Sequence, residues 1–127
     1  MSKFILIGEL AECYSAGMRR KVAAVITDIL GDRVVVMAEA VEHVILRHFT
    51  LFPRTMVLEL IERVLRDPSE VFEEKKKHIF HLFYRFDSHH YIVVIVKRTT
   101  QGSFFVTAYP TGAAHRGKHK NLKKVRL

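Results

Sequence analysis

The sequence lacks the features by which many small proteins stabilise themselves covalently or cross membranes. Its 127 residues include a single cysteine, Cys13, so no disulfide can form within the chain. No apolar run approaches the roughly 20 residues needed to span a bilayer. The N-terminus has neither a basic region followed by a long apolar run nor a small-residue cleavage site. We therefore expect a cytoplasmic protein that does not insert into membranes.

The signatures of several enzyme classes are missing as well. The sequence has no phosphate-cradling glycine-rich loop, no dinucleotide fingerprint, no paired-cysteine zinc site and no Gly-x-Ser-x-Gly elbow. Eight histidines raise the question of a metal, but ligands as close together as Asp87, His89 and His90 rarely close a tetrahedral site alone. We predict neither a cofactor nor a bound metal.

Positive charge is concentrated at the C-terminal end. The formal net charge is +8 at pH 7, of which residues 113–127 carry +6 and residues 1–112 only +2. A basic tail beside a near-neutral body is typical of a polyanion binder, because binding to phosphates releases counterions. The alternative is a solvated terminus that aids solubility. The residues expected to bind such a polyanion are Arg116, Lys118, Lys120, Lys123 and Lys124.

The most strongly patterned stretch predicts a β-hairpin. Residues 92–96 are a β-branched run too short for a helix, which indicates a strand near the middle of a sheet. Residues 99–103 supply a turn, and residues 104–109 return antiparallel until Pro110 ends the strand. With a period of two, Phe105, Thr107, Tyr109 and Thr111 share one face, and Phe104, Val106 and Ala108 share the other. The hydroxyl-bearing face is either solvated or the floor of a substrate site.

The remaining segments alternate between helical and extended patterns. Residues 39–49 and 55–66 have helical spacing, and Pro68 ends the second helix. Residues 69–77 are predicted to form an edge strand or turn and residues 78–86 a strand in which His81 and Arg85 share a face. In the N-terminal third, a strand is expected over Lys3 to Leu10. A hairpin is expected over residues 21–30 and 33–37 around Gly31-Asp32, with a helix over residues 19–30 as the competing interpretation.

The predicted fold class is α+β: two helices packed on a four-stranded antiparallel sheet, with an additional N-terminal strand and hairpin. At 127 residues the chain is expected to be a single domain. Its parts are N-terminal strands (residues 1–38), a core (residues 39–112) and the basic tail (residues 113–127).

Several polar residues suit acid/base chemistry on an RNA phosphodiester. Such cleavage needs a base for the ribose 2′-hydroxyl, cations for the phosphorane and an acid for the leaving oxygen. The available groups are His43 and Arg47 on the first helix, His81 and Arg85 on one strand, Lys97 on the next, and Thr107 with Tyr109 on the last. The register between the strands decides which of them share a face.

Five motifs follow one another along the chain in a recognisable order. They are HVILRH on the first helix, RDPSEVFEEKKKH at the end of the second, FYRF, YIVVIVKR and FFVTAYPT. This order, over residues 39–120, resembles the phage-encoded branch of the barnase/EndoU/colicin/RelE-like ribonucleases. The resemblance implies an α+β fold and a largely metal-independent endoribonuclease, often a toxin. The chain departs from the expected pattern after His48, where Phe49 stands in place of a proline.

The resemblance also implies roles for individual residues. His43 would be the helix histidine, with Arg47 and His48 completing the segment. Arg85 and Lys97 would be the basic strand positions, and the hydroxyl cluster would comprise Thr107, Tyr109 and Thr111. We therefore predict a small, toxin-like, metal-independent endoribonuclease that needs no cofactor, with RNA and a cognate inhibitor or antitoxin as partners. The alternative is a non-catalytic RNA-binding or partner-regulating module on the same fold.

Overall fold

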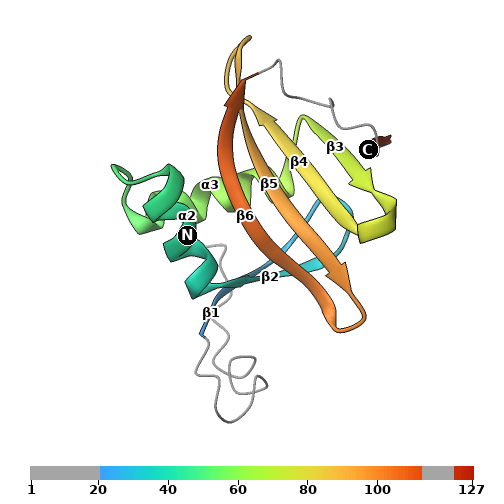
Figure 1. Ribbon diagram of the computed structural model, residues 1–127, viewed down its shortest axis with the longest axis horizontal. Helices are drawn as coiled ribbons and strands as arrows, with labels where there is room; N and C mark the ends of the chain where they lie inside the picture. The colour runs from blue at the N-terminus through green and yellow to red at the C-terminus, as the bar shows by residue number, and fades with distance from the viewer. Residues whose placement is uncertain (1–20, 113–121) are drawn as a thin grey trace.

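The structure, a computed structural model, describes residues 21–112 and 122–127. These residues form two α-helices and one mixed sheet of seven strands in the order β1-β2-β6-β5-β4-β3-β7 (Figure 1). The elements are β1 (Val22–Thr27), β2 (Arg33–Met37), α2 (Ala38–His48), α3 (Arg54–Arg66), β3 (Glu70–Glu74), the 3₁₀ turn η1 (Lys75–Lys77), β4 (Ile79–Arg85), β5 (His90–Thr99), β6 (Gly102–Gly112) and β7 (Leu122–Val125). The fold is α+β, but the predicted four-stranded sheet corresponds only to the central part, β3 to β6.

The hairpin of β5 and β6 stands at the centre of the sheet, as predicted. Every residue from Tyr91 to Val96 is buried, because β5 has neighbours on both edges and apolar side chains on both faces. The last pair of the hairpin joins Thr99 to Gly102, which has φ +133°, a conformation that favours glycine. The strands β3, β4, β5 and β6 follow one another as an antiparallel meander.

The N-terminal hairpin is present, but its turn is longer than predicted. β1 ends at Thr27, and the chain turns over residues 28–32 instead of over Gly31-Asp32 alone. The carboxylate of Asp28 organises this turn, since its Oδ1 accepts hydrogen bonds from the backbone N–H groups of Leu30 and Asp32, each at 2.9 Å. The helix considered for residues 19–30 does not form over the described residues of that range.

The sheet is mixed because β2 joins β6 in parallel. Only two residue pairs make this contact, Val34 with Ser103 and Val35 with Phe104. Beyond them, no described strand pairs with the outer edge of β6. A proline is tolerated on such an edge, where no partner strand needs its N–H group. The prediction that Pro110 ends the strand is therefore wrong: Pro110 pairs with Ile92, and β6 continues to Gly112.

A β-bulge in β6 overturns the predicted division of its faces. The register shifts between Ile95, which pairs with Thr107, and Val96, which pairs with Phe105. Val106 is thus an extra residue without a partner of its own on β5. Phe105 turns into the core with Ala108, whereas Thr107 and Tyr109 lie on the opposite face of the sheet. The prediction that Phe105 shares a face with Thr107 is wrong.

The segment predicted as an edge strand or turn contains both kinds of structure, but the strand is not an edge. β3 is followed by η1, and β7 pairs antiparallel with β3 on its outer side. Part of the predicted basic tail therefore belongs to the sheet. Lys123 and Lys124 lie on β7, opposite Glu73 and Phe72 respectively.

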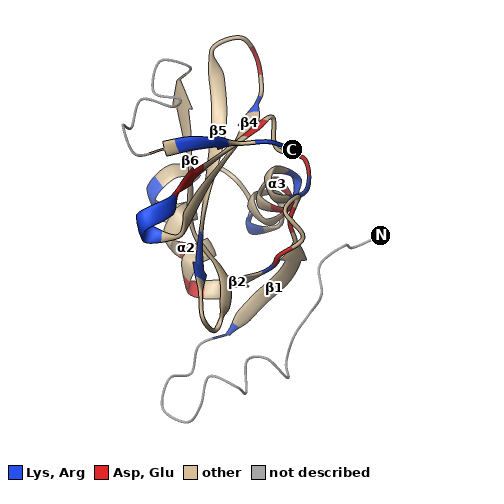
Figure 2. Cartoon of the chain, turned by 90° about the vertical axis from the view of Figure 1, so that its right-hand side faces the viewer, with Lys and Arg blue, Asp and Glu red and all other residues tan. Residues whose placement is uncertain are grey.

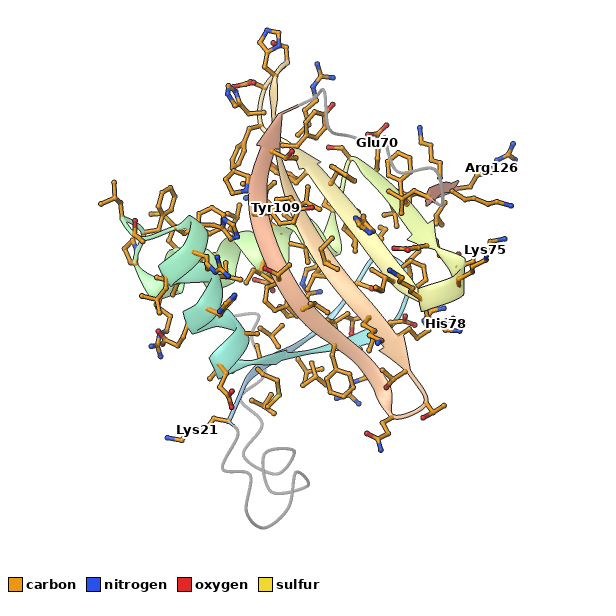
Figure 3. The ribbon with its side chains drawn as sticks, viewed as in Figure 1. Lys21, Glu70, Lys75, His78, Tyr109 and Arg126 are labelled. Atoms are coloured by element: carbon orange, nitrogen blue, oxygen red, sulfur yellow. The ribbon has the colours of Figure 1, made fainter. Side chains whose placement is uncertain are left out.

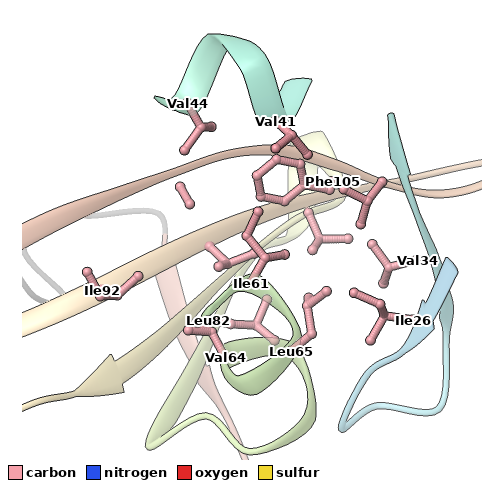
Figure 4. Packing of buried hydrophobic residues seen from close by; sticks show 14 of the residues in the cluster. Ile26, Val34, Val41, Val44, Ile61, Val64, Leu65, Leu82, Ile92 and Phe105 are labelled. Carbon is pink, nitrogen blue, oxygen red and sulfur yellow. The ribbon is translucent and has the colours of Figure 1, made fainter. Parts of the chain in front are cut away.

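Both predicted helices are confirmed and cover one face of the sheet. α2 follows β2 directly, and its first N–H group, from Ala38, donates to the carbonyl of Lys21. α3 begins after Pro53 and ends before Pro68, which disfavours a helical Asp67. Figure 4 shows the packed core between helices and sheet. Its fully buried members include Ile26, Val34, Val41, Val44, Ile61, Val64, Leu65 and Leu82.

Some predictions fall outside the described residues. The strand expected over Lys3 to Leu10, the cysteine Cys13 and the basic residues Arg116, Lys118 and Lys120 all lie there. Among the residues that are described, no helix has the length and apolar character required to cross a membrane.

The buried carboxylate of Asp28 gives a test of the β1–β2 turn. Burial is the main cause that raises its pKa above the ordinary 3.8. Because the pKa of Asp28 is higher in the folded state, its protonated form favours folding. This contribution is fully present below about pH 4 and is lost as the pH rises through the raised pKa. Asp28→Asn keeps the acceptor without the charge, so at neutral pH we expect it to be at least as stable as the wild type. Asp28→Ala leaves two N–H groups without their acceptor and should lower the unfolding free energy by about 1–3 kcal/mol.

Urea denaturation of the wild type and both variants, at neutral and at acid pH, measures these differences. An Asn variant as unstable as the Ala variant would show that the charge, and not the acceptor, is what the turn requires.

Candidate functional site

The face of the sheet opposite the two helices carries most of the polar residues singled out above. His81 on β4 and Thr107 on β6 both pair with Ile95 of the strand between them, so they lie in one row about 10 Å apart. Arg85 and Thr111 occupy another such row, on either side of Tyr91. We call this surface the open face.

The open face has an apolar floor of its own. Phe83, Tyr91, Val93 and Ile95 form a second buried cluster, separate from the core under the helices. The rings of Phe83 and Tyr91 meet edge to face, with centroids 6.1 Å apart. Polar side chains therefore stand around an ordered apolar centre, which lowers the local dielectric constant and strengthens charge interactions there.

The bulge at Val106 determines which side chains of β6 reach this face. Without the extra residue, strict alternation would place Thr107 and Tyr109 beside Phe105 in the core. Instead, Tyr109 packs at the edge of the open-face cluster and is labelled there in Figure 3. Bulges often serve this purpose next to active sites, by redirecting a side chain.

Helix α2 brings a histidine to the same place. The ring of His48, in the last turn of α2, lies 5.9 Å from the ring of Tyr109, centroid to centroid, at a tilt of 47°. α2 packs beside β6, along the part of that strand whose outer edge has no described strand partner. An imidazole and a phenol 61 residues apart in the sequence thus meet at the border of the open face.

The other two residues predicted on α2 lie on a defined flank of that helix. Glu42 forms an ion pair with Arg54 of α3 and so marks the side of α2 that faces α3. His43 and Arg47 are about 100° and 140° around the helix from Glu42, on the flank turned away from α3. Both side chains are exposed. His43 and Arg47 can therefore reach a ligand that contacts this flank of α2.

The hydroxyl of Tyr109 is in a state suited to donating hydrogen bonds. Partial burial raises the pKa of this phenol above its ordinary value of 10.0. The group therefore stays protonated at neutral pH and can donate to an anionic oxygen. Thr107, two residues earlier on the same face, adds a second hydroxyl.

The predicted basic residues do not all converge on Tyr109. Lys97 is four positions along β5 from Val93, the partner of Tyr109, which corresponds to about 13 Å along the strand. Arg85 lies in the opposite direction, at the end of β4 next to the β4–β5 turn. Its Nε donates a hydrogen bond to the carbonyl of Asp87 at 3.2 Å. The backbone positions of Lys97 and Arg85 are therefore too far apart for a single phosphate beside Tyr109 to lie next to both of them.

Two further histidine-bearing parts of this region can be placed, the strand β4 and the β4–β5 turn. His81, which the sequence offered as an available group without a specific role, shares the open face with Thr107. The turn with Asp87 and His90 is structural: one carboxylate oxygen accepts the N–H groups of His89 and His90 and contacts the His90 ring at 2.9 Å. These bonds, first that from the His89 backbone, lower the pKa of Asp87.

Two of the five basic residues expected to contact RNA, Lys123 and Lys124, lie in the described part of the chain. Lys124 forms an ion pair with Glu70 at 3.5 Å, and Lys123 is exposed on β7. Within residues 21–112 and 122–127, no group of three or more His, Cys, Asp or Glu side chains has an arrangement that would hold a metal ion.

The fold and this face define a class: small α+β proteins whose open sheet face lies beside a histidine-bearing helix. Within that class, residues 9–127 match the family described as phage-Barnase-EndoU-ColicinE5/D-RelE like nuclease2, and the chain belongs to this nuclease family. The match confirms the resemblance in motif order and extends it almost to the N-terminus. Comparison with curated proteins and with solved structures gives no significant match.

The raised pKa of Tyr109 is open to direct measurement. An ultraviolet titration of the wild type, minus that of Tyr109→Phe, should isolate one phenol that ionises above pH 10.0, because burial disfavours its charged form. A circular dichroism spectrum of the variant controls for its fold. Ionisation at or below pH 10.0 would contradict the partly buried position of this side chain.

Proposed function

We propose that the protein is a metal-independent endoribonuclease whose active site lies on the open face, at its border with α2. The observation that carries the proposal is the contact between His48 and Tyr109. It joins the histidine segment of α2 to the hydroxyl-bearing strand, the two parts that acid/base cleavage of a phosphodiester needs close together. Membership of a nuclease family supports the same reaction class.

In the proposed mechanism His48 takes the proton of a ribose 2′-hydroxyl. The 2′-oxygen attacks the adjacent phosphorus, the bond to the 5′-oxygen breaks, and the products are a 2′,3′-cyclic phosphate and a 5′-hydroxyl. A second group returns a proton to the 5′-oxygen, and His43 is the other histidine of α2 available for this step. The ring of Tyr109 packs against the His48 imidazole, and this contact would orient the base before substrate binds.

The charge that develops on the phosphorane needs donors and cations. The protonated phenol of Tyr109 and the hydroxyl of Thr107 would donate hydrogen bonds to its oxygens. Arg47, on the exposed flank of α2, and Arg85, on the open face, would supply positive charge. Preorganised donors of this kind typically contribute about 10²–10³ in rate.

Incubation of the protein with RNA in excess EDTA tests this proposal. Wild type should release fragments that end in 2′,3′-cyclic phosphate. His48→Ala should lower the cleavage rate by about 10²–10⁴, the usual contribution of a general acid or base. His43→Ala, made in parallel, reports whether the second helix histidine takes part. His89→Ala is the matched control, because that imidazole is exposed in the β4–β5 turn and, among the described residues, His89 makes a hydrogen bond there only through its backbone N–H.

Two outcomes would redirect the proposal. A wild-type rate in His48→Ala with loss of activity in His43→Ala would move the central role to His43. Salt-sensitive RNA binding by a wild type that cleaves nothing would favour the second candidate, a non-catalytic RNA-binding module, since the basic residues of the C-terminal segment suffice for that function.

A further inference from the structure

One cluster of cations has no part in the site described above. The turn between β3 and β4 consists of Lys75, Lys76 and Lys77 in η1, followed by His78 in the left-handed conformation with φ 55°. All four side chains are exposed. We call residues 75–78 the basic turn. Figure 2 shows its blue ribbon on the side of the sheet away from α3, close to the blue strand β7.

The basic turn is connected to the open face through Lys97. The residue that follows the turn, Ile79, pairs with Lys97 across β4 and β5. In addition, the backbone N–H of Arg98 donates to the carbonyl of His78 at 2.9 Å. Lys97 therefore lies next to the basic turn, while it is about 13 Å along its strand from the partner of Tyr109. It stands between the candidate active site and the turn.

Neighbouring acids neutralise only part of this charge. Glu74 pairs with Lys77 at 3.6 Å, Glu70 with Lys124 at 3.5 Å, and Glu73 lies opposite Lys123 in the β3–β7 ladder. In the described part of the chain, no ion pair involves Lys75, Lys76 or Lys97. A band of uncompensated cations thus extends from the open face to the basic turn.

We infer that the basic turn, reached through Lys97, is a second RNA contact that binds the backbone phosphates of a single strand beyond the cleaved bond. This inference rests on the proposed function for the nature of the ligand. It also assigns Lys97 to a neighbouring phosphate, because a strand crossing the open face from β6 toward β3 passes Lys97 before it reaches Lys75 and Lys76. Such contacts are insensitive to base sequence, so they fix the strand and its direction but do not select a cleavage site.

The test is binding of a single-stranded RNA oligonucleotide that carries 2′-O-methyl groups on every ribose and therefore cannot be cleaved. Fluorescence anisotropy over a series of salt concentrations gives the affinity and its salt dependence. Each phosphate contact in a single strand contributes about 0.7 to the slope of log affinity against log salt. Lys75→Ala/Lys76→Ala should therefore bind more weakly and reduce the slope by about 1.4.

Two comparisons make the result specific. Lys21→Ala/Arg33→Ala removes the same charge from exposed positions at the β1–β2 edge, and Lys21 is labelled far from Lys75 in Figure 3. This control should keep the wild-type slope. A 2′-O-methyl dinucleotide, too short to extend from Tyr109 to the basic turn, should bind wild type and Lys75→Ala/Lys76→Ala equally.

Equal weakening by the two double variants would overturn the inference, since it would reflect net charge alone. An unchanged slope in Lys75→Ala/Lys76→Ala would overturn it as well. These outcomes are independent of the nuclease proposal: the ligand cannot be cleaved, so a failure to cleave RNA leaves the binding result intact, and a failure of the basic turn leaves the cleavage assay unaffected.

Discussion

The burial of β5 on both of its faces is the constraint on which the rest of the structure depends. Six consecutive residues from Tyr91 to Val96 are withdrawn from water, so each face of the sheet centre needs an apolar layer. α2 and α3 supply that layer on one side. On the other side no helix among the described residues does so, and aromatic side chains of the sheet itself, with Phe83 and Tyr91 at the centre, form the second cluster.

That arrangement leaves a face that is ordered but open to a ligand, and the candidate site lies at its border with α2. β2 pairs with β6 over only two residues, which leaves the rest of that edge for α2. The bulge at Val106 then turns Thr107 and Tyr109 toward the open face, where His48 of α2 contacts the ring of Tyr109. A helix end, a bulge and a short parallel pairing together form the candidate site.

The local elements were predictable from the sequence because their patterns are local. The β-branched run of β5 and the helical spacing of α2 and α3 identified those elements. Features that depend on contacts between distant parts of the chain were not predictable. The sequence pattern does not reveal that Val106 is an extra residue. Burying the face with Phe105 or the face with Phe104 would in either case bury an aromatic ring. The lysine-rich β7 was assigned to a tail because only its pairing with the glutamates of β3, 50 residues away, makes it a strand. Lys97 shares the open face with Tyr109, but the distance between them depends on register.

The most direct test of the central claim is an NMR titration with a non-cleavable 2′-O-methyl dinucleotide, following the imidazole resonances of His48 and the backbone amides of β6. The structure predicts shifts that centre on His48, Thr107 and Tyr109, with no comparable change on α3, which lies across the sheet. Shifts confined to α3 and the far side of the core, or their absence from the border between α2 and β6, would contradict an RNA site on the open face.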